Sequence, residues 1–336
     1  MAVKKIVAVG VAEDRGNDEA VIGSGKRSKG IKKMKVRPYI QGLIQGLDAL
    51  GQRLGPDYVI HFRQREVANL NAATFARPGG TGGAPYVIFC MSTNVVRAAA
   101  NVFPAASNQP IVGIVSEPSI ERAGTPAAPG GIFDTLTNIC GISAQRSQTS
   151  DACYERFLRA VPTLRTVHVL HMPNYGPSER ALTLVRNAVA PPQQLDVVNL
   201  RDAAHLMQDL NPLPQQDPDS ATNHGVLVLP IDVCLGHAQE IIDFVQQGKG
   251  MPAFFPVPDW VRSDASGAFG AYGLSQRQCG MLMAERVQAI WANNGTVPGG
   301  GFARWKTAPK EAFDFLVSAA VADDQNIQLD SSIPRV

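Results

Sequence analysis

The pattern of apolar and polar positions along the chain predicts strands that alternate with helices from one end to the other. Short runs rich in Val, Ile and Phe are typical of buried strands, because parallel strands covered on both faces are almost continuously apolar. Such runs occupy residues 4–11, 57–62, 85–90, 110–115, 166–172, 195–200, 224–230, 251–257 and 267–273. The alternation predicts the α/β class, with parallel sheets.

Between the strands, apolar residues recur every three or four positions, which predicts amphipathic helices. These patterns occupy residues 39–55, 67–76, 92–103, 150–161, 178–189, 201–210, 236–249, 275–295 and 310–321. The first is predicted to bury one stripe and to end at a glycine: Ile40, Leu43, Leu47 and Leu50, then Gly51 or Gly55. The helix at 275–295 is predicted to bury another: Met281, Ala284, Val287 and Trp291. Ser150 is the predicted N-cap of its helix.

The alternation breaks at residues 116–131, which are rich in Pro, Gly and Ala and show no period. A long irregular connection in a compact protein usually marks a domain boundary or a functional loop. The chain has 336 residues, enough for two domains. We therefore predict one lobe from residues 1–117 with 259–298 and a second from 118–258 with 299–336. The chain would cross between the lobes several times, as in a hinge.

Composition narrows the function classes. Apolar residues make up 45% of the chain, charged residues 18%, and the net charge is +2, so we predict a globular protein and no nucleic-acid partner. The five cysteines and six histidines show no metal-ligand spacing, and we predict neither a metal nor a disulfide framework. The N-terminus lacks a secretory signal, which favours the cytoplasm if the chain is complete.

The stretch AVIGSGKRSKG at residues 20–30 resembles a phosphate-binding loop. A P-loop requires G-x-x-x-x-G-K-[ST], but Ala20 replaces the first glycine and Arg27 replaces the hydroxyl residue after Lys26. We therefore predict no nucleotide here and no cofactor. The stretch belongs to a basic cluster that is either a solvated loop or a lip that contacts an anion or a partner: Lys26, Arg27, Lys29, Lys32, Lys33, Lys35 and Arg37.

Two cysteines suggest an enzyme as the alternative function. Cys90 lies at the end of a strand in one half and Cys234 follows a strand in the other, with His237 three residues further on. Cofactor-independent amino-acid racemases use such a pair: one thiolate removes the α-proton and the other thiol returns a proton on the opposite face. The residues that accompany the racemase cysteines are absent. The residues therefore leave two functions open: a non-catalytic binding protein and, as the alternative, a two-cysteine racemase or isomerase.

Five segments in order carry a resemblance to a known family: residues 39–51, 110–119, 128–143, 155–174 and 267–291. They include a glycine-containing first helix, an Ile-Val strand that ends in a turn, a Pro-Gly-Gly crossover and a Gly-Ala-aromatic strand before a long helix. This pattern resembles the substrate-binding proteins of ABC transporters, in the tryptophan/tyrosine branch. The resemblance implies the type I periplasmic-binding-protein fold, with two Rossmann-like lobes joined by three crossings and a ligand between them.

The resemblance also implies what the protein binds and where it works. The ligand would be a small amino acid or related carboxylate, aromatic by resemblance. Hinge closure would present the protein to the membrane permease of an ABC transporter in the periplasm. The protein would be a monomer or a weak dimer and not an enzyme.

Ligands of open α/β sheets bind beyond the carboxyl ends of the strands, and the resemblance implies the same edge. The residues selected in this way are Ser92, Thr93, Asn94, Ser116, Glu117, Asn174, Tyr175, Asp232 and Tyr272. Hydroxyls at a helix N-terminus suit a carboxylate, acidic side chains suit an ammonium group, and tyrosines pack on a ligand side chain. Structural roles remain open: Ser92 and Thr93 as helix caps, and Glu117 as part of a turn. For Asp232 the alternative to ligand binding is to cap the helix that follows it, and for Tyr272 it is to be a core residue.

Overall fold

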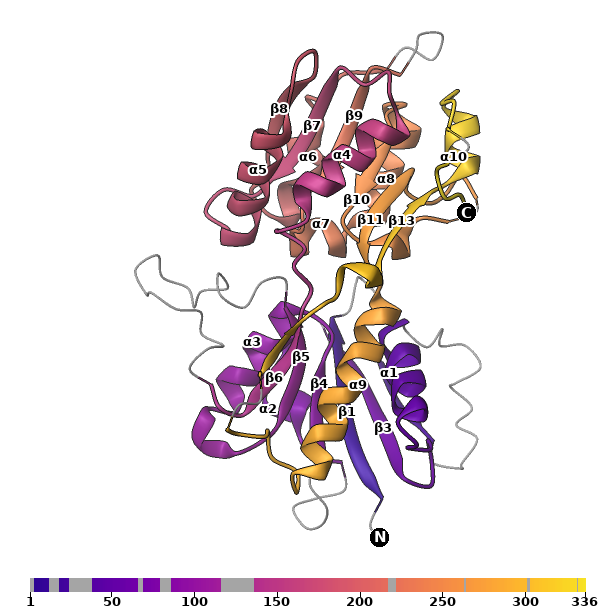
Figure 1. Cartoon of the computed structure of the whole chain (residues 1–336). Coiled ribbons are helices and arrows are strands. Elements are labelled where there is room, and N and C mark those ends of the chain that lie inside the picture. Colours follow the sequence, from indigo (N-terminus) through magenta and orange to yellow (C-terminus); the bar gives the residue numbers. More distant parts are fainter. Residues whose placement is uncertain are drawn as a thin grey trace. The chain divides into compact units, whose positions relative to one another are not determined.

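The structure is a computed structural model. It describes residues 3–11, 18–23, 38–65, 69–78, 86–115, 136–216, 222–262, 264–300, 303–330 and 332–336. The chain forms two compact units, shown in Figure 1. Unit 1 is Met1–Ala144 with Gln276–Ala308, and unit 2 is Gln145–Ser275 with Pro309–Val336. The chain therefore passes between the units three times.

The sheet of unit 1 has the strand order β12-β6-β5-β4-β1-β3-β2. The strands are β1 (Lys4–Val11), β2 (Asp18–Ile22), β3 (Tyr58–Arg65), β4 (Tyr86–Cys90), β5 (Ile111–Val115), β6 (Ile139–Ser143) and β12 (Trp305–Thr307). All neighbours are parallel except β2, which runs antiparallel to β3 at the edge. Ile6, Val7 and Ala8 are fully buried in β1, which explains the continuous apolar run of that strand.

The helices of unit 1 are α1 (Pro38–Ala49), α2 (Ala72–Phe75), α3 (Thr93–Val102), η2 (Ala105–Ser107) and α9 (Gln276–Ala292). Helices α1 and α9, far apart in sequence, pack side by side (Figure 1). A Cβ atom on Gly42 would collide with the carbonyl oxygen of Arg277, and one on Gly280 with that of Tyr39. Glycines therefore allow the two helix backbones to approach each other closely.

The sheet of unit 2 has the strand order β13-β11-β10-β9-β7-β8. The strands are β7 (Thr166–His171), β8 (Gln194–Asn199), β9 (His224–Val228), β10 (Ala253–Phe255), β11 (Gly270–Leu274) and β13 (Phe313–Val317). Only β13 among these runs antiparallel to its neighbour, β11. The core between sheet and helices includes Phe157 stacked on Phe254, with ring centroids 5.0 Å apart.

The helices of unit 2 are α4 (Ser150–Ala160), α5 (Gly176–Ala188), η3 (Ala203–His205), α6 (Leu206–Leu210), α7 (Asp232–Gly236), α8 (Ala238–Ile242), the π-helix η4 (Asp243–Gly248), η5 (Pro258–Trp260), η6 (Lys310–Ala312) and α10 (Ala319–Asp324). The π-helix carries the buried Gln246. Its Oε1 accepts the N–H groups of Ala253 and Phe269, and its Nε2 donates to the carbonyl of Gly267. One amide thus connects η4 with the starts of β10 and β11.

The predicted fold class is confirmed, because both units are built on mostly parallel α/β sheets. The unit boundaries differ from the predicted lobes. Strand β6 was expected in the second lobe, with residues 118–258, but it pairs with β5 in unit 1. Strand β11 was expected in the first lobe, with residues 259–298, but it pairs with β10 in unit 2. The three crossings come directly after β6, β11 and β12. Strand pairing between distant segments leaves no local signal in the sequence.

Several expected elements also differ in detail. Residues 310–321 were expected to form one helix but contain η6, β13 and the start of α10. The side chains of Phe313, Phe315 and Val317 recur with the period of two that belongs to a strand. Met281 and Leu50, expected on buried stripes, are 42% and 40% exposed.

Two local predictions at chain turns have mixed outcomes. The N-cap of α4 is Thr149, and Ser150 lies inside the helix, where its Oγ donates to the carbonyl of Arg146 at 3.2 Å. Helix α1 ends at Ala49, and Gly51 follows with a φ of +76°, as the glycine stop predicts.

The stretch that resembled a P-loop starts in a strand. Residues 20–22 belong to β2, and Gly23 follows it with a φ of +90°. The basic cluster between residues 26 and 37 lies outside the described residues.

Candidate functional site

In unit 1, the candidate residues Ser92, Thr93 and Asn94 follow the carboxyl end of β4. Ser92 is the N-cap of α3, and its Oγ accepts the backbone N–H of Val95 at 3.4 Å. Thr93 is buried and Asn94 is half-buried. The capping role considered for Ser92 is therefore present, at a helix start whose remaining N–H groups favour an anion.

Three other candidates lie wholly or partly outside the described residues. Ser116 and Glu117 follow β5, in the stretch of residues 116–135 that is not described. Asp232 is the first residue of α7, but its side chain is not described. Strand β9, which precedes Asp232, is paired with β7. Asp232 and the loop after β7 therefore follow neighbouring strands of one sheet.

In unit 2, the candidates Asn174 and Tyr175 form the connection from β7 to α5. Asn174 is exposed and has a φ of +64°, in the left-handed region. Tyr175 is half-buried and is the N-cap residue of α5. The first turn of α5 accepts hydrogen bonds from the loop: Ser178 Oγ from the N–H of Met172 at 2.9 Å, and Glu179 Oε1 from the N–H of Asn174 at 3.0 Å.

Residues that the sequence analysis did not select lie beside this loop. His171 is the last residue of β7 and only 5% exposed, and its Nδ1 lies 3.0 Å from Oδ1 of Asn199, the last residue of β8. The His171 Nε2 lies 3.4 Å from Glu179 Oε2. Their position in the sequence could have indicated them, because His171 and Asn199 are the last residues of two strands that pair in parallel.

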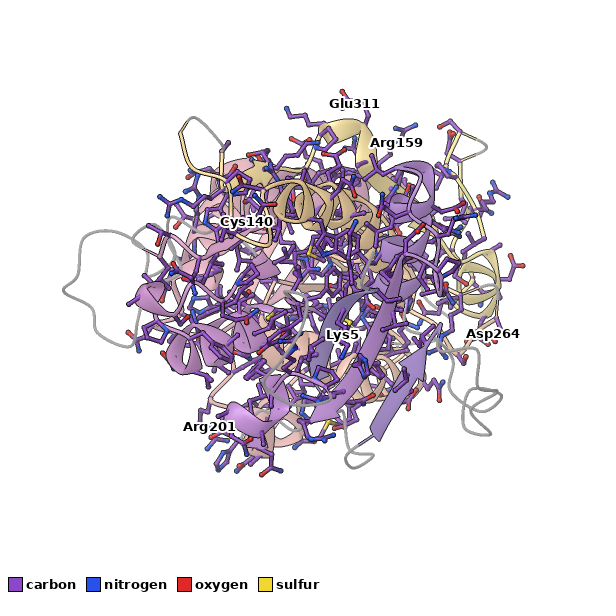
Figure 2. The ribbon with its side chains drawn as sticks, turned by 90° about the horizontal axis from the view of Figure 1, so that it is seen from below. Lys5, Cys140, Arg159, Arg201, Asp264 and Glu311 are labelled. Atoms are coloured by element: carbon purple, nitrogen blue, oxygen red, sulfur yellow. The ribbon has the colours of Figure 1, made fainter. Side chains whose placement is uncertain are left out.

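The connection after β8 is also fixed by side chains. Arg201 donates its backbone N–H and its Nε–H to the carboxylate of Asp209, at 2.9 and 2.8 Å. Burial alone would raise the pKa of Asp209, but the hydrogen bonds from Arg201 hold that pKa below its ordinary value. Arg201 itself lies at the surface (Figure 2). Its charge is therefore largely compensated by Asp209.

Tyr272 lies in a different environment from the other candidates. It is half-buried in β11, and its ring centroid lies 5.9 Å from that of Phe313. The guanidinium carbon of Arg156, on α4, lies 4.3 Å from the Tyr272 ring centroid, close enough for a cation–π contact. The structure thus places Tyr272 in an aromatic cluster with α4 and β13, which is the core-like role considered as its alternative.

The two cysteines of the racemase hypothesis are both inaccessible. Cys90 and Cys234 are each 0% exposed, and burial raises the pKa of both thiols far above the ordinary value. Cys140 on β6 is buried in the same way, and burial raises its pKa to about 12. His237 is bound to Glu240 at 2.9 Å. Protonated thiols with no access to solvent cannot act as catalytic bases.

Within the described ranges, no three His, Cys, Asp or Glu side chains are placed to hold a metal ion. None of the helices in the described part of the chain combines the length and the apolar character needed to cross a bilayer.

Two α/β units joined by three crossings define the type I periplasmic-binding-protein fold, and solved structures share it. One, a conserved domain protein from Vibrio cholerae, has a TM-score of 0.65 at 16% identity, over 98% of this chain and 96% of the other. Another, from Streptococcus pneumonia and described as an ABC domain in complex with L-Trp, has a TM-score of 0.63 at 11% identity, over 99% and 100%.

A third structure is an ABC transporter solute-binding protein from Agrobacterium vitis, bound with α-D-tagatopyranose. Its TM-score is 0.53 at 13% identity, over 97% of this chain and 98% of the other. No model of a known protein family matches the chain, and no curated protein matches its sequence. The similarity to solved structures is therefore a similarity of fold.

Proposed function

We propose that this chain is a solute-binding protein, non-catalytic, that captures a small molecule for ABC-type uptake or sensing. The observation that carries the proposal is the fold: two parallel α/β units with three chain crossings, with polar side chains at the carboxyl ends of strands in each. Structures with this fold include an ABC domain in complex with L-Trp and an ABC transporter solute-binding protein bound with α-D-tagatopyranose. The partner on this proposal is a membrane permease.

The finer part of the proposal concerns the ligand. We propose an amino acid or related carboxylate, and candidate groups for it occur in each unit. Ser92 and the N-terminus of α3 supply an anion-binding group in unit 1. In unit 2, the exposed amide of Asn174 offers both a donor and an acceptor. The resemblance of the sequence to the tryptophan/tyrosine branch makes aromatic amino acids the first ligands to test.

The experiment is native mass spectrometry of the purified protein, to detect a co-purified ligand, followed by thermal-shift titration. The panel contains L-tryptophan, L-tyrosine, other amino acids, small carboxylates, and D-tagatose as a sugar. A ligand at a hundredfold excess over its Kd stabilises the folded state by about 2.7 kcal/mol. A shift with sugars alone would contradict the amino-acid part, and no shift with any compound would contradict solute binding.

A matched pair of variants tests the site. Asn174→Gly removes the candidate amide and keeps a residue that tolerates the left-handed backbone. Asn326→Gly is the control, because Asn326 is an exposed asparagine of unit 2 with a similar φ of 54°. We expect Asn174→Gly to weaken ligand binding about tenfold by calorimetry, and Asn326→Gly to leave it unchanged. Equal affinities in the two variants would remove Asn174 from the site.

A further inference from the structure

Three aromatic residues share one face of the sheet at the β13 edge of unit 2. Tyr272 on β11 is paired with Phe315 on the edge strand β13, and Phe313 lies two residues earlier on β13. Residues directly opposite each other in an antiparallel pair, and residues two apart in one strand, point to the same face. The ring centroids of Tyr272 and Phe313 are 5.9 Å apart. All three residues are only half-buried, so this aromatic cluster is open to solvent.

The half-buried side chain of Arg156, on α4, lies over this cluster. Its guanidinium carbon is 4.3 Å from the ring centroid of Tyr272 and 5.8 Å from that of Phe315. Both distances are within the range of a cation–π contact. The ring faces attract the charge of the guanidinium, and its N–H donors stay available for an acceptor. The two rings therefore hold a cation in place at the surface of unit 2.

Arg156 differs from other arginines of unit 2 in what its N–H groups contact. Arg159, on the same helix, donates Nη2–H to the Ser332 hydroxyl at 2.7 Å, and Arg201 is bound to Asp209. Arg156 forms no hydrogen bond or ion pair with any described residue, and its contacts are with the two rings. The described part of unit 2 thus contains a positioned guanidinium without an acceptor.

We propose that unit 2 carries a docking surface for a protein partner that presents an acidic side chain beside an apolar one. The docking surface consists of Arg156, Tyr272, Phe313 and Phe315. Charge complementarity selects the acidic side chain, because a carboxylate accepts two N–H groups of one guanidinium at once. The apolar side chain covers the open aromatic rings, and arginine, tyrosine and phenylalanine are the residues enriched in protein interfaces. The contact needs no bound solute, so it is independent of the proposed function.

The test is an NMR titration of the whole chain with the peptide acetyl-Leu-Glu-Leu-amide. Binding is followed at the Nε–H of Arg156 and at the backbone N–H groups of Phe313 and Phe315. The comparison peptide is acetyl-Leu-Gln-Leu-amide, which has the same size and no charge. We expect the Glu peptide to give saturable shifts with a Kd of about 1 mM. The Gln peptide should bind at least about fivefold more weakly, because it cannot form charge-assisted hydrogen bonds of the same strength.

Three variants make the result specific. Arg156→Gln removes the charge, so the Glu peptide should bind about tenfold more weakly and no better than the Gln peptide. Arg156→Lys keeps the charge without the planar fork of donors, and its affinity should lie between the two. Arg186→Gln is the control, because Arg186 is an exposed arginine on α5 of the same unit. It should bind the Glu peptide like the unaltered protein. Circular dichroism checks that each variant is folded.

The docking surface is refuted if the Glu peptide gives no saturable shifts at these residues up to about 10 mM, or if the Gln peptide binds equally well. It is also refuted if folded Arg156→Gln keeps full affinity, or if Arg186→Gln loses as much. Sodium acetate that binds as tightly as the Glu peptide would show that a carboxylate alone is recognised, which contradicts a protein partner. Calorimetry with L-tryptophan on the same proteins reports on the solute separately, so either result can fail without the other.

Discussion

At the scale of single residues, unit 2 contains a chain of three polar side chains across β8, β7 and β9. The His168 Nδ1 lies 2.8 Å from Asp196 Oδ2, and its Nε2 lies 3.1 Å from the Nδ1 of His224. The two imidazole planes are 15° apart and their centroids are separated by 5.3 Å. The facing nitrogens therefore point at each other nearly in line, with room for one hydrogen between them. A second proton would place two N–H groups face to face.

This geometry predicts a loss of stability in acid. Burial, and then the charge of His168, lower the pKa of His224 below its ordinary value of 6.5. The unfolded chain consequently binds more protons than the folded one as the pH falls through about 6.5. The folded state should lose stability through that range, and the loss should level off once the pH is below the folded pKa. Melting temperatures measured between about pH 7.5 and 5 test this.

The comparison that isolates the effect uses two variants. His224→Gln keeps an amide beside His168 and removes the titration, so the melting temperature should depend less on pH. His205→Gln is the control, since His205 is a histidine of the same unit that is 45% exposed and bound to Asp202. A pH dependence that is unchanged in His224→Gln would show that the His168–His224 contact does not limit protonation.

At the scale of elements, the α1–α9 contact explains why both helices contain interior glycines, although other residues stabilise a helix better. Glycine in a helix interior costs about 0.5–1 kcal/mol relative to alanine. Gly42 and Gly280 nevertheless occupy the face where the two backbones meet, and a Cβ atom at either would overlap a carbonyl oxygen of the other helix. The close approach of α1 and α9 therefore depends on the absence of these side chains.

Alanine substitutions at this contact should separate the helices. Gly42→Ala and Gly280→Ala are each expected to lower the free energy of unfolding by about 1–3 kcal/mol, as for overpacking in a core, measured by urea denaturation. The matched control is Gly236→Ala on α7, where a Cβ atom meets no atom within 4 Å. Alanine there should leave the stability equal or slightly higher. Full stability in Gly42→Ala would mean that the helices tolerate a wider spacing.

At the scale of the whole molecule, each unit is assembled from two separate pieces of chain. Unit 2 takes its edge strand β13 and the helix α10 from the C-terminal piece Pro309–Val336. That piece supplies core residues to unit 2, among them Val317, Val321 and Ile333. A continuous segment of residues 145–275 therefore lacks part of its own core and leaves β11 without one neighbour.

The register of β11 and β13 predicts how to complete unit 2 on its own. Leu274 pairs with Phe313 in an antiparallel ladder, so an Asn-Gly turn can join residue 274 to residue 313. Residues 145–274 joined in this way to 313–336 should fold cooperatively, as judged by thermal unfolding and dispersed NMR spectra. Residues 145–275 alone should not. Equal stability of the two chains would show that β13 and α10 contribute little to the core.

Much of the architecture could be predicted from local patterns. The first strand was predicted at residues 4–11, where β1 lies, and the glycine stop after α1 was predicted near Gly51. The placement of Ser92 at a helix start was also correct. Residues 310–321 were not predicted correctly, because apolar residues spaced by two and by three or four overlap there. Whether the candidate site residues bind a solute stays a prediction.

By itself, the sequence determined the alternation of strands and helices, and with it the α/β class. These features depend on neighbouring residues, whose burial and backbone preferences are local. Only the tertiary structure decided which strands pair, where the chain crosses between units, and that His171, Asn199 and Glu179 meet beside the β7–α5 loop. The reason is physical: backbone hydrogen bonds between strands are the same for every side chain, and contacts between distant segments form only when the sheet is assembled.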